Sequence, residues 1–429
     1  MSSYSSDARM NVVESLVFHS RLLLLPVLLM CLIEFGQIWY FSPNDYGDVI
    51  RSGGDGIFRK ILWLLALIAI LGHFLRCGLL MVARVLLPLL PFVLWCCLST
   101  ILWSVDPLFS LKSVVFWAIA SLVAASAAIE VDSKLLLRTL GTFFVVVVLC
   151  SFALAVVVPQ SGFTRYGNEL VLRGFFPHKN VFGWFCAIGG ILIIANRQYI
   201  STRTSLFFIL IITLAILAAQ SQTSIVAVTA GLLYIFAVRL LKRCFGDGAR
   251  AFYAMMISLT LAASVVFYLY PFLLDLVGRD TTLTGRTAVW EHYFSYLIHR
   301  PVTGLGVGIF SSDTDINLAI GGSVPGFEYQ KLHSPHSLYV GLFGEVGFVG
   351  LLLFLGGHAY IAIIASFKSN NTWVHCAGAL SFLIILAGTA EMRDGIIPGI
   401  ATIMLIVARG ASLRSLFPNA GLYMKNEVA

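Results

Sequence analysis

Basic and imidazole side chains gather in two polar stretches of an otherwise apolar chain. One is the block 173–180, RGFFPHKN, and the other runs from about Asp275 to Gly350. Arginine binds phosphate oxygens through charge-assisted, often bidentate hydrogen bonds. Histidine is the side chain best suited to accept a proton near neutral pH. Together these residue types indicate acid–base chemistry on an anionic, phosphate-bearing molecule.

The first block places three anion-binding side chains directly before an apolar run, and they are Arg173, His178 and Lys179. Gly174 and Pro177 predict a turn within the block. Asn180 is placed to cap a helix that begins near Val181. The N-terminus of a helix favours phosphate, so we expect an anion to bind here. Interface residues that snorkel towards the membrane surface have the same composition, and spacing does not separate the two interpretations.

The segment GRTAVW carries an arginine and an aromatic residue four positions apart, Arg286 and Trp290. This spacing places both side chains on one face if the segment is helical, and Thr284 could cap such a helix. An arginine beside an aromatic ring suits a diphosphate with a sugar stacked nearby. An amphipathic helix lying on the membrane surface has the same pattern, so both interpretations stay open.

Arg300 precedes a glycine-rich stretch, GLGVG at 304–308. Glycines at this density predict a tight turn that neighbouring backbone approaches closely. The stretch lacks the strand–helix–strand context of a dinucleotide site, so dinucleotide binding is excluded. Arg300 is the residue of this segment that we expect to bind substrate.

Two histidines three residues apart, His333 and His336, precede a long apolar run. Nearby arginines favour the neutral form of His336 through like-charge repulsion, and a neutral imidazole is what a general base requires. A His-x-x-His pair also binds metal ions, but the sequence offers no third ligand beside it. We therefore expect His336 to act as a base and expect no metal to be bound.

Four glycines recur at every third position of the apolar run that follows, and they are Gly341, Gly344, Gly347 and Gly350. Small residues at this spacing allow another helix to approach closely. Glu345 lies among them, and a carboxylate inside a membrane requires a partner or a function. We expect Glu345 to pair with an arginine or to stabilise the fold.

Hydropathy predicts the elements that position these residues. Of the 429 residues, 59% are hydrophobic and 11% are charged, whereas soluble domains are typically about 25% charged. Apolar runs of roughly 20 residues, the length of a membrane span, recur throughout the chain, so we predict an all-α integral membrane protein of about twelve transmembrane helices. The predicted spans include Leu22–Phe41, Ile61–Phe74, Val85–Trp103 and Phe252–Leu273. The first is expected to be retained because no small-residue cleavage site follows it.

The expected organisation is a cytoplasmic tail at 1–21, helices one to nine at 22–273, a large periplasmic loop at 274–334, helices ten to twelve at 335–408 and a cytoplasmic tail at 409–429. The short loops assigned to the cytoplasm carry Lys or Arg pairs, whereas the outer segments hold most of the Asp and Glu, and this bias orients membrane proteins. The formal charge of +7 follows from the bias and does not indicate nucleic acid.

Four segments resemble the O-antigen ligase and Wzy-type polysaccharide polymerase superfamily. They are LWSVDPLFSLK at 102–112, RGFFPHKNVFG at 173–183, TGRTAVW with HRPVTGLGVGIF within 284–310, and HSPHSLYVGLFGEVGFVGLLLF at 333–354. The resemblance covers most of the chain and is closest to exopolysaccharide polymerases of the succinoglycan type. Many members carry an asparagine after the second histidine of the last segment, where this chain has Ser337.

The resemblance implies a glycosyltransferase C-like fold, and we expect it in the bacterial inner membrane, with both termini placed in the cytoplasm by the charge bias of the loops. It implies inverting, metal-independent transfer of a glycan from undecaprenyl diphosphate to a sugar hydroxyl at the periplasmic face, without a cofactor. The matching catalytic residues are Arg173, Arg286 and His336. The side chains expected to contact the diphosphate or the glycan are Arg300, Lys179, His178, Trp290 and His333. Expected partners are the undecaprenyl-diphosphate-linked oligosaccharide, membrane lipid, a flippase and a chain-length regulator.

We predict a polymerase that extends a repeat-unit glycan in exopolysaccharide or O-antigen biosynthesis. The alternative within the superfamily is a ligase that transfers O-antigen to lipid A–core, and the two differ in their acceptor. A secondary transporter for polysaccharide or a small molecule is a different class, and it would place ionisable residues near the bilayer centre. The candidates for such residues are Glu34, His73, Glu345 and His358. A non-enzymatic partner in an assembly complex is the third alternative.

Overall fold

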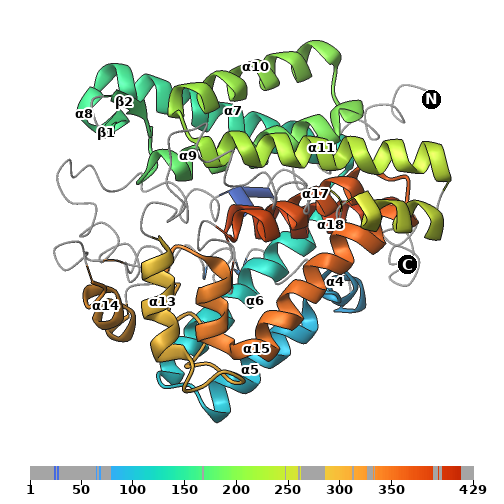
Figure 1. The fold of residues 1–429 in the computed structure, drawn as a ribbon. Coiled ribbons are helices and arrows are strands. Elements are labelled where there is room, and N and C mark those ends of the chain that lie inside the picture. The colour runs from blue at the N-terminus through green and yellow to red at the C-terminus, as the bar shows by residue number, and fades with distance from the viewer. Residues whose placement is uncertain are drawn as a thin grey trace, which may run out of the picture.

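The computed structural model describes residues 79–166, 169–246, 248–258, 261, 286–311, 314–325, 332, 334–389, 395 and 399–416, together with 24–25, 27–28, 64 and 67–68. Most of these residues are helical (Figure 1). The long helices are α5 (Leu90–Leu102), α6 (Pro107–Glu130), α7 (Ser133–Val157), α9 (Lys179–Ala195), α10 (Thr202–Ala219), α11 (Gln222–Phe245), α13 (Arg286–Leu297), α15 (Leu338–Ala359), α17 (Thr372–Ala387) and α18 (Ile400–Leu416).

The shorter elements are α4 (Leu79–Leu86), α8 (Pro159–Gly162), the 3-10 turn η1 (Arg197–Tyr199), α14 (Asp315–Gly322), the π-helical turn η2 (Tyr360–Ala365) and α16 (Ser366–Lys368). Two short strands, β1 (Phe163–Tyr166) and β2 (Glu169–Leu172), pair antiparallel with Phe163 opposite Leu172. The predicted spans Leu22–Phe41, Ile61–Phe74 and Phe252–Leu273 lie largely outside the described residues.

Among the described residues, five helices are long and apolar enough to cross a membrane. They are α6, α7, α10, α11 and α15 with its continuation to Ile363. A bent pair, α4 with α5, would make a sixth, and α9 and α17 are shorter apolar helices. The structure is therefore that of an all-α, multi-pass membrane protein, whereas the predicted number of about twelve spans is not confirmed.

The prediction of one continuous span at Val85–Trp103 is wrong. The structure contains two helices there, α4 and α5, which meet at an angle of 90°. Pro88 lies in the break and Pro91 in the first turn of α5. A proline removes one backbone donor and its ring clashes with the preceding helical turn. Hydropathy averaged over a window does not detect a helix break caused by proline. The sequence therefore predicted one continuous span.

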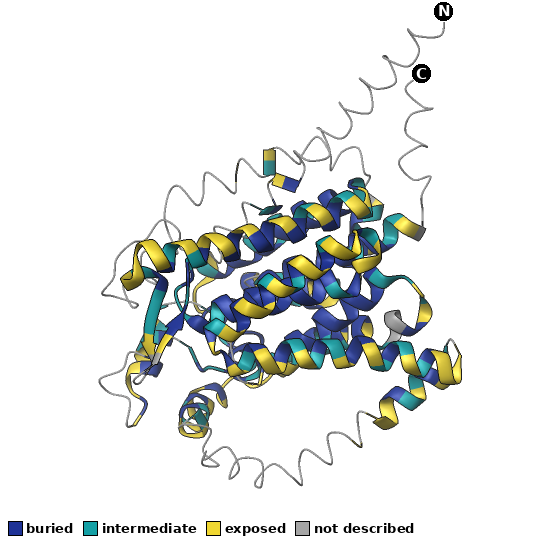
Figure 2. Ribbon diagram, turned by 90° about the horizontal axis from the view of Figure 1, so that it is seen from above, coloured by how far each residue is buried: buried dark blue, intermediate teal, exposed yellow. Residues whose placement is uncertain are grey.

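The helices pack in a sequence that differs from their order in the chain. Neighbouring contacts run from α6 to α18, then to α17, α11, α9 and α10, and Figure 1 shows α17 and α18 between the two halves of the bundle. Buried side chains fill the space between these helices, as Figure 2 shows in dark blue. Aromatic pairs contribute to this packing, for example Phe144 and Phe185 with ring centroids 4.5 Å apart.

The outer surface of the bundle is apolar as well. On α10 the exposed side chains include Leu206, Phe207 and Leu210, whereas Ile212 on the same helix is buried. An exposed apolar surface of this extent would be unfavourable in water and is stable against lipid. The side chains therefore indicate a helix with one face in the protein and the other in the bilayer.

The bundle has two ends, and each is defined by the segments that lie there. We call one the loop end, because the β1–β2 hairpin, α13 and α14 lie there, on the left of Figure 1. We call the other the basic end, which contains residues 196–201 and 366–372. At the basic end, Gln198 donates to Thr372 over 3.1 Å and Lys242 donates to the carbonyl of Ser369 over 2.8 Å. The loop end carries the residues that the sequence analysis singled out.

Candidate functional site at the loop end

Helix α13 begins at Arg286 and carries the predicted Arg286–Trp290 pair on one face, which confirms that this segment is helical. A second, smaller apolar core holds the helix through buried Val289, Tyr293 and Leu297. The Tyr293 hydroxyl donates to Oδ1 of Asn317 in α14 over 2.7 Å. Burial raises the pKa of Tyr293, so the hydroxyl keeps the proton that this hydrogen bond uses.

One hydrogen bond brings the Arg286 helix to the predicted base. The indole Nε1 of Trp290 donates to the carbonyl oxygen of Pro335 over 3.0 Å, and Pro335 directly precedes His336. Arg286 lies one helical turn before Trp290. Residues almost 50 positions apart in the sequence thus meet where α13 packs against the start of α15. The helix that carries Arg286 therefore packs beside the backbone that precedes His336, and a contact between the two side chains stays a prediction.

The backbone around His336 is held in an unusual conformation. His336 has φ 51°, in the left-handed region that non-glycine residues seldom adopt. Its own N–H donates to the Ser334 hydroxyl over 3.3 Å. Behind it, the Ser337 hydroxyl and the Leu338 N–H both donate to the carbonyl of Gly388, over 3.3 and 2.8 Å. The end of α17 therefore fixes the backbone on the other side of His336.

The predicted helix begins later than expected, and His336 lies just outside it. Ser337 is the N-cap residue of α15, and the helix begins at Leu338. Ser337, where many members of the resembling superfamily have asparagine, uses its hydroxyl to bind Gly388. Its contact is structural, and the imidazole of His336 precedes the helix at a half-buried position.

Helix α15 is broken at Gly347, where φ is 69° and ψ is −174°. A Cβ at this position would lie 2.1 Å from the carbonyl oxygen of Val302, so only glycine fits. The loop 300–311 occupies the break: Phe348 N–H donates to Pro301 over 2.8 Å, and Gly344 accepts from Leu305 over 2.8 Å. The glycine spacing had predicted close approach by another helix, but at Gly347 an irregular loop approaches instead.

The same loop contacts the turn between α5 and α6. Trp103 Nε1 donates to the carbonyl of Thr303 over 2.8 Å, and Val105 N–H donates to Leu305 over 2.8 Å. Arg300 donates from Nη1 to the carbonyl of Trp103 over 3.3 Å, and its side chain is exposed. The described parts of three segments that carry the superfamily resemblance, 102–112, 299–310 and 334–354, therefore form one connected unit. The predicted turn at 304–308 is confirmed, with positive φ at its three glycines.

Glu345 binds this loop from within α15. Its Oε1 accepts hydrogen bonds from the Phe310 N–H over 3.0 Å and from the Ser311 hydroxyl over 2.7 Å. The side chain is fully buried, and Oε2 has no hydrogen-bond partner among the described residues. Of the two roles expected for Glu345, the structure supports stabilisation of the fold. The sequence alone could not identify Ser311 as the partner, because the pairing depends on how the loop enters the helix break.

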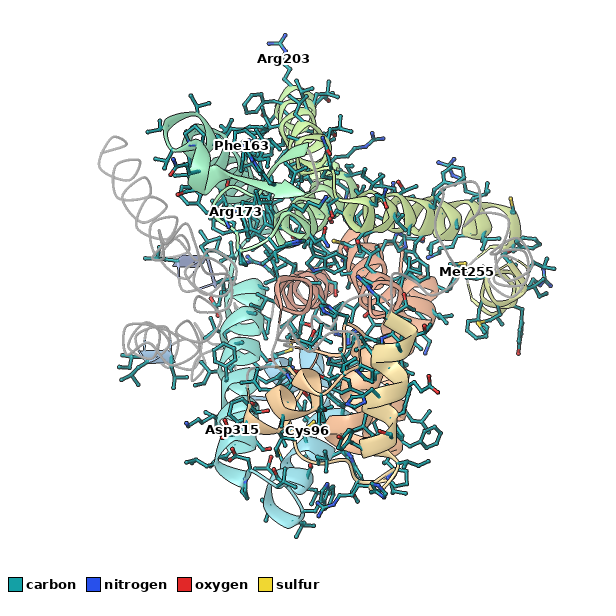
Figure 3. All side chains as sticks on the ribbon, turned by 60° about the vertical axis from the view of Figure 1, so that its left-hand side comes forward. Cys96, Phe163, Arg173, Arg203, Met255 and Asp315 are labelled. Atoms are coloured by element: carbon teal, nitrogen blue, oxygen red, sulfur yellow. The ribbon has the colours of Figure 1, made fainter. Side chains whose placement is uncertain are left out.

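The block around Arg173 lies at the same end of the bundle, on different elements (Figure 3). Arg173 Nε donates to the carbonyl of Ser161 over 2.9 Å, just after strand β2. Burial lowers the pKa of the Arg173 guanidinium, which nevertheless stays charged near neutral pH. The predicted turn is present, with φ 58° at Gly174. The described hydrogen bonds that Arg173 donates go to Ser161 and Gly162 of α8, so its convergence with Arg286 stays a prediction.

The prediction that Asn180 caps the following helix is wrong by two residues. His178 is the N-cap residue of α9, and its Nδ1 accepts from the Asn180 N–H over 3.2 Å. The side-chain oxygen of Asn180 instead accepts from Ser221 over 3.1 Å. Because the Nδ1 of His178 is an acceptor in this cap, its ring is a structural element of the helix start. Lys179 begins the helix and is largely buried.

The remaining predicted residues differ in how far the structure describes them. His333 lies outside the described residues, as does Thr284. Within the part of the chain that the structure describes, no group of three or more His, Cys, Asp or Glu side chains is arranged to hold a metal ion. The donor set at the loop end is instead cationic and imidazole, which suits an anionic substrate.

A model of the protein family described as O-antigen ligase matches residues 206–355. No curated protein matches the chain. The matched residues contain Arg286, Trp290, Arg300 and His336, whereas Arg173 and Lys179 precede them. The match confirms the resemblance to the O-antigen ligase and Wzy superfamily, and together with the helices it supports a membrane protein of the ligase or polymerase type. The closeness to succinoglycan-type polymerases stays a prediction.

Proposed function

We propose that the chain transfers a glycan from a polyprenyl diphosphate to a sugar hydroxyl, using Arg286 and His336. The observation that carries this proposal is the hydrogen bond from Trp290 to the carbonyl of Pro335, because it docks the Arg286 helix beside His336. The family match over residues 206–355 supports the same class of reaction. Lipid-linked oligosaccharides are the substrates that this family match suggests.

The proposed reaction is an inverting displacement. The oxygen of the acceptor hydroxyl attacks the anomeric carbon, its proton passes to His336, and the bond between the anomeric carbon and the diphosphate breaks. The electron pair of that bond leaves on the diphosphate, whose growing negative charge Arg286 stabilises through bidentate hydrogen bonds. Arg173 supplies a second cation if the substrate spans both sites. The hydrogen bond from Trp290 to Pro335 keeps the Arg286 helix beside His336 during the reaction.

A polymerase that joins lipid-linked repeat units at the periplasmic face is our first assignment. The second is a ligase that transfers the glycan to lipid A–core, which the description of the matched family favours. The two are distinguished by the acceptor. Flippase and chain-length regulator proteins would act before and alongside a polymerase, and the protein would lie in the inner membrane.

The test is to delete the gene, analyse the secreted and lipid-linked glycans, and then supply the purified protein with each acceptor. A polymerase lengthens the lipid-linked repeat unit, and the deletion strain accumulates single units. If the purified protein modifies lipid A–core and never lengthens a repeat unit, the polymerase assignment is wrong and the ligase assignment stands. Uptake into vesicles without any change in the lipid-linked glycan would show that the protein is a transporter.

A further inference from the structure

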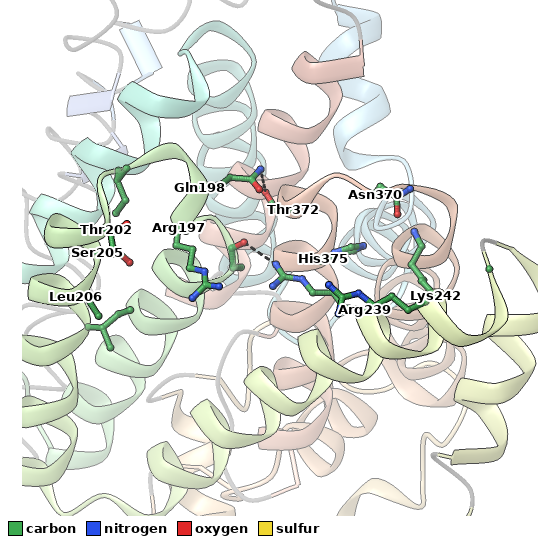
Figure 4. A pocket seen from close by; sticks show the side chains of 15 residues that line it. Arg197, Gln198, Thr202, Ser205, Leu206, Arg239, Lys242, Asn370, Thr372 and His375 are labelled. Carbon is green, nitrogen blue, oxygen red and sulfur yellow. Dashed lines mark hydrogen bonds between the residues drawn. The ribbon is translucent and has the colours of Figure 1, made fainter.

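A cavity of about 1030 Å³ lies at the basic end of the bundle, away from the proposed site. It is open to one side and is lined by the 3-10 turn η1, the start of α10, the end of α11 and the start of α17 (Figure 4). The superfamily resemblance assigns no role to this region. The sequence analysis used its basic residues only to orient the helices.

Positive side chains dominate the polar lining of the cavity, and they are Arg197, Arg239, Lys242 and Arg243. Among the described residues that line it, none is acidic. Arg197 and Arg243 lie within electrostatic reach of Arg239 and repel its charge. Like charges held this close destabilise one another unless an anion binds between them. An anion that binds between these side chains would relieve their mutual repulsion.

Hydrogen bonds to backbone carbonyl oxygens hold three side chains of the lining in place. Lys242 is buried, and its Nζ donates to the carbonyl of Ser369 over 2.8 Å. The Nε2 of His375 lies 3.1 Å from the same carbonyl. Arg239 donates from Nη2 to the carbonyl of Ala195 over 3.3 Å. Arg197 and Arg243 are exposed at the mouth of the cavity, Arg239 is half-buried and Lys242 is buried. A bias of positive residues towards the cytoplasm does not require that they line one cavity, because solvated loop charges orient a helix equally well.

One wall of the cavity is apolar and continues onto the lipid-facing surface. Leu206 and Ile209 of α10 line it, and Leu206 is 63% exposed. The opposite wall offers neutral hydrogen-bonding groups, among them Gln198 and Thr372, which bind each other over 3.1 Å. A polar cavity that opens beside an apolar, lipid-facing helix fits a headgroup with its acyl chains along α10.

We propose that this cavity binds a phosphate-bearing anion, with the phosphate between Arg197, Arg239 and Arg243. The apolar wall makes the headgroup of an anionic phospholipid the favoured source of that phosphate, and a soluble phosphate compound is the other source of the same chemistry. This site is separate from the proposed transferase site and does not depend on its reaction.

The test measures lipid retained by the purified full-length protein in native mass spectrometry, with phosphatidylglycerol and phosphatidylcholine added in turn. The double variant Arg197→Gln with Arg243→Gln is expected to bind phosphatidylglycerol about 25-fold more weakly, since each basic group near a lipid phosphate contributes about a fivefold factor. Phosphatidylcholine binding is expected to be equal in both proteins. The thermal unfolding temperature without added lipid shows whether the variant is folded.

The matched control is Arg203→Gln with Arg250→Gln, which removes the same charge from residues that do not line the cavity. Arg203 projects away from the bundle (Figure 3), and the control is expected to bind phosphatidylglycerol like the wild type. If both double variants lose binding equally, the effect is general surface charge and the proposal fails. Another outcome is that the wild type retains both lipids equally, while inorganic pyrophosphate raises the unfolding temperature of the wild type and not of the cavity variant. In that case the ligand of the cavity is a soluble phosphate compound. If neither phosphatidylglycerol nor pyrophosphate binds, there is no such site.

Discussion

At the scale of single residues, the conformation of His336 separates a catalytic role from a packing role. A left-handed backbone costs a non-glycine residue about 1–2 kcal/mol, and glycine adopts it freely. If the imidazole serves packing, replacement by glycine destabilises the protein and leaves the transfer rate unchanged. If the imidazole is the general base, the same replacement lowers the rate and leaves the stability unchanged.

We expect His336→Gly to lower transferase activity by about a hundredfold to ten-thousandfold, the usual contribution of a positioned general base. The same change is expected to leave the unfolding temperature unchanged or slightly higher, because glycine relieves the strained φ. The two measurements are the rate of glycan transfer and the unfolding temperature of the purified protein. An active, destabilised His336→Gly protein would show that the imidazole serves packing.

Glu345 provides a second prediction at this scale. In Glu345→Ala the buried N–H of Phe310 and the hydroxyl of Ser311 lose their acceptor, which costs about 1–3 kcal/mol for each unpaired buried donor. In Glu345→Gln the amide oxygen replaces Oε1 and most of this stability is expected to remain. Thermal unfolding in one detergent compares the two variants. If Glu345→Ala is as stable as the wild type, Glu345 does not stabilise the fold.

At the scale of elements, the break in α15 positions the loop on which the site rests. Gly347 leaves the carbonyls of Gly344 and Glu345 without helical partners, and the N–H groups of Leu305 and Gly306 bind them over 2.8 and 2.9 Å. A broken helix inside a membrane is stable only where such partners exist. The loop and the break therefore depend on each other.

Gly347→Ala is expected to disrupt this unit, because its Cβ would overlap the Val302 carbonyl and its φ would be unfavourable. We expect a loss of folded protein or an unfolding temperature lower by several degrees. Gly356→Ala is the matched control on the same helix, since a Cβ there meets nothing within 4 Å. The recovered fraction after size-exclusion chromatography and the unfolding temperature are compared. Equal behaviour of both variants would contradict the account of the break.

Residue types and spacing predicted the helices and turns well, but they did not predict which distant segments contact them. The helix at Arg286, the turn at Gly174 and the turn at 304–308 follow from spacing and residue type, and all are present. The break at Gly347 was missed because glycines at every third position suit helix packing and a helix break equally. What decides between them is a loop more than 40 residues earlier in the chain.

Small offsets in the sequence prediction also changed residue roles. Composition favours Asn180 as the cap, but its side-chain oxygen accepts from Ser221, and His178 caps the helix instead. Likewise, Arg300 was expected to bind substrate, and the structure places its guanidinium against the carbonyl of Trp103. Its role in substrate binding stays a prediction. Which hydrogen-bond partner a side chain takes depends on tertiary packing, and tertiary packing cannot be deduced from one sequence.

At the scale of the whole molecule, the account requires the two ends of the bundle to face opposite sides of the membrane. The loop end would face the periplasm and the basic end the cytoplasm. Asp315 of α14 and Arg203 of α10 are exposed residues at these two ends (Figure 3). Each can be replaced without removing a described hydrogen bond of its side chain.

We expect a cysteine at position 315 to react with a membrane-impermeant maleimide in intact cells. We expect a cysteine at position 203 to react only after the membrane is opened. Both substitutions, Asp315→Cys and Arg203→Cys, are made in a variant that lacks the natural cysteines, since Cys150 and Cys244 are exposed. Equal labelling of the two positions in intact cells would contradict the orientation and with it the periplasmic site.

The central claim is that a guanidinium at the loop end stabilises the departing diphosphate without a metal ion. The most direct measurement is the rate at which purified Arg286→Lys transfers glycan from the lipid-linked donor, with and without a chelator. Lysine keeps the charge but loses the bidentate fork, so we expect the rate to fall by about a hundredfold or more, while the chelator leaves the wild-type rate unchanged. Wild-type activity in Arg286→Lys, or strong inhibition of the wild type by the chelator, would contradict it.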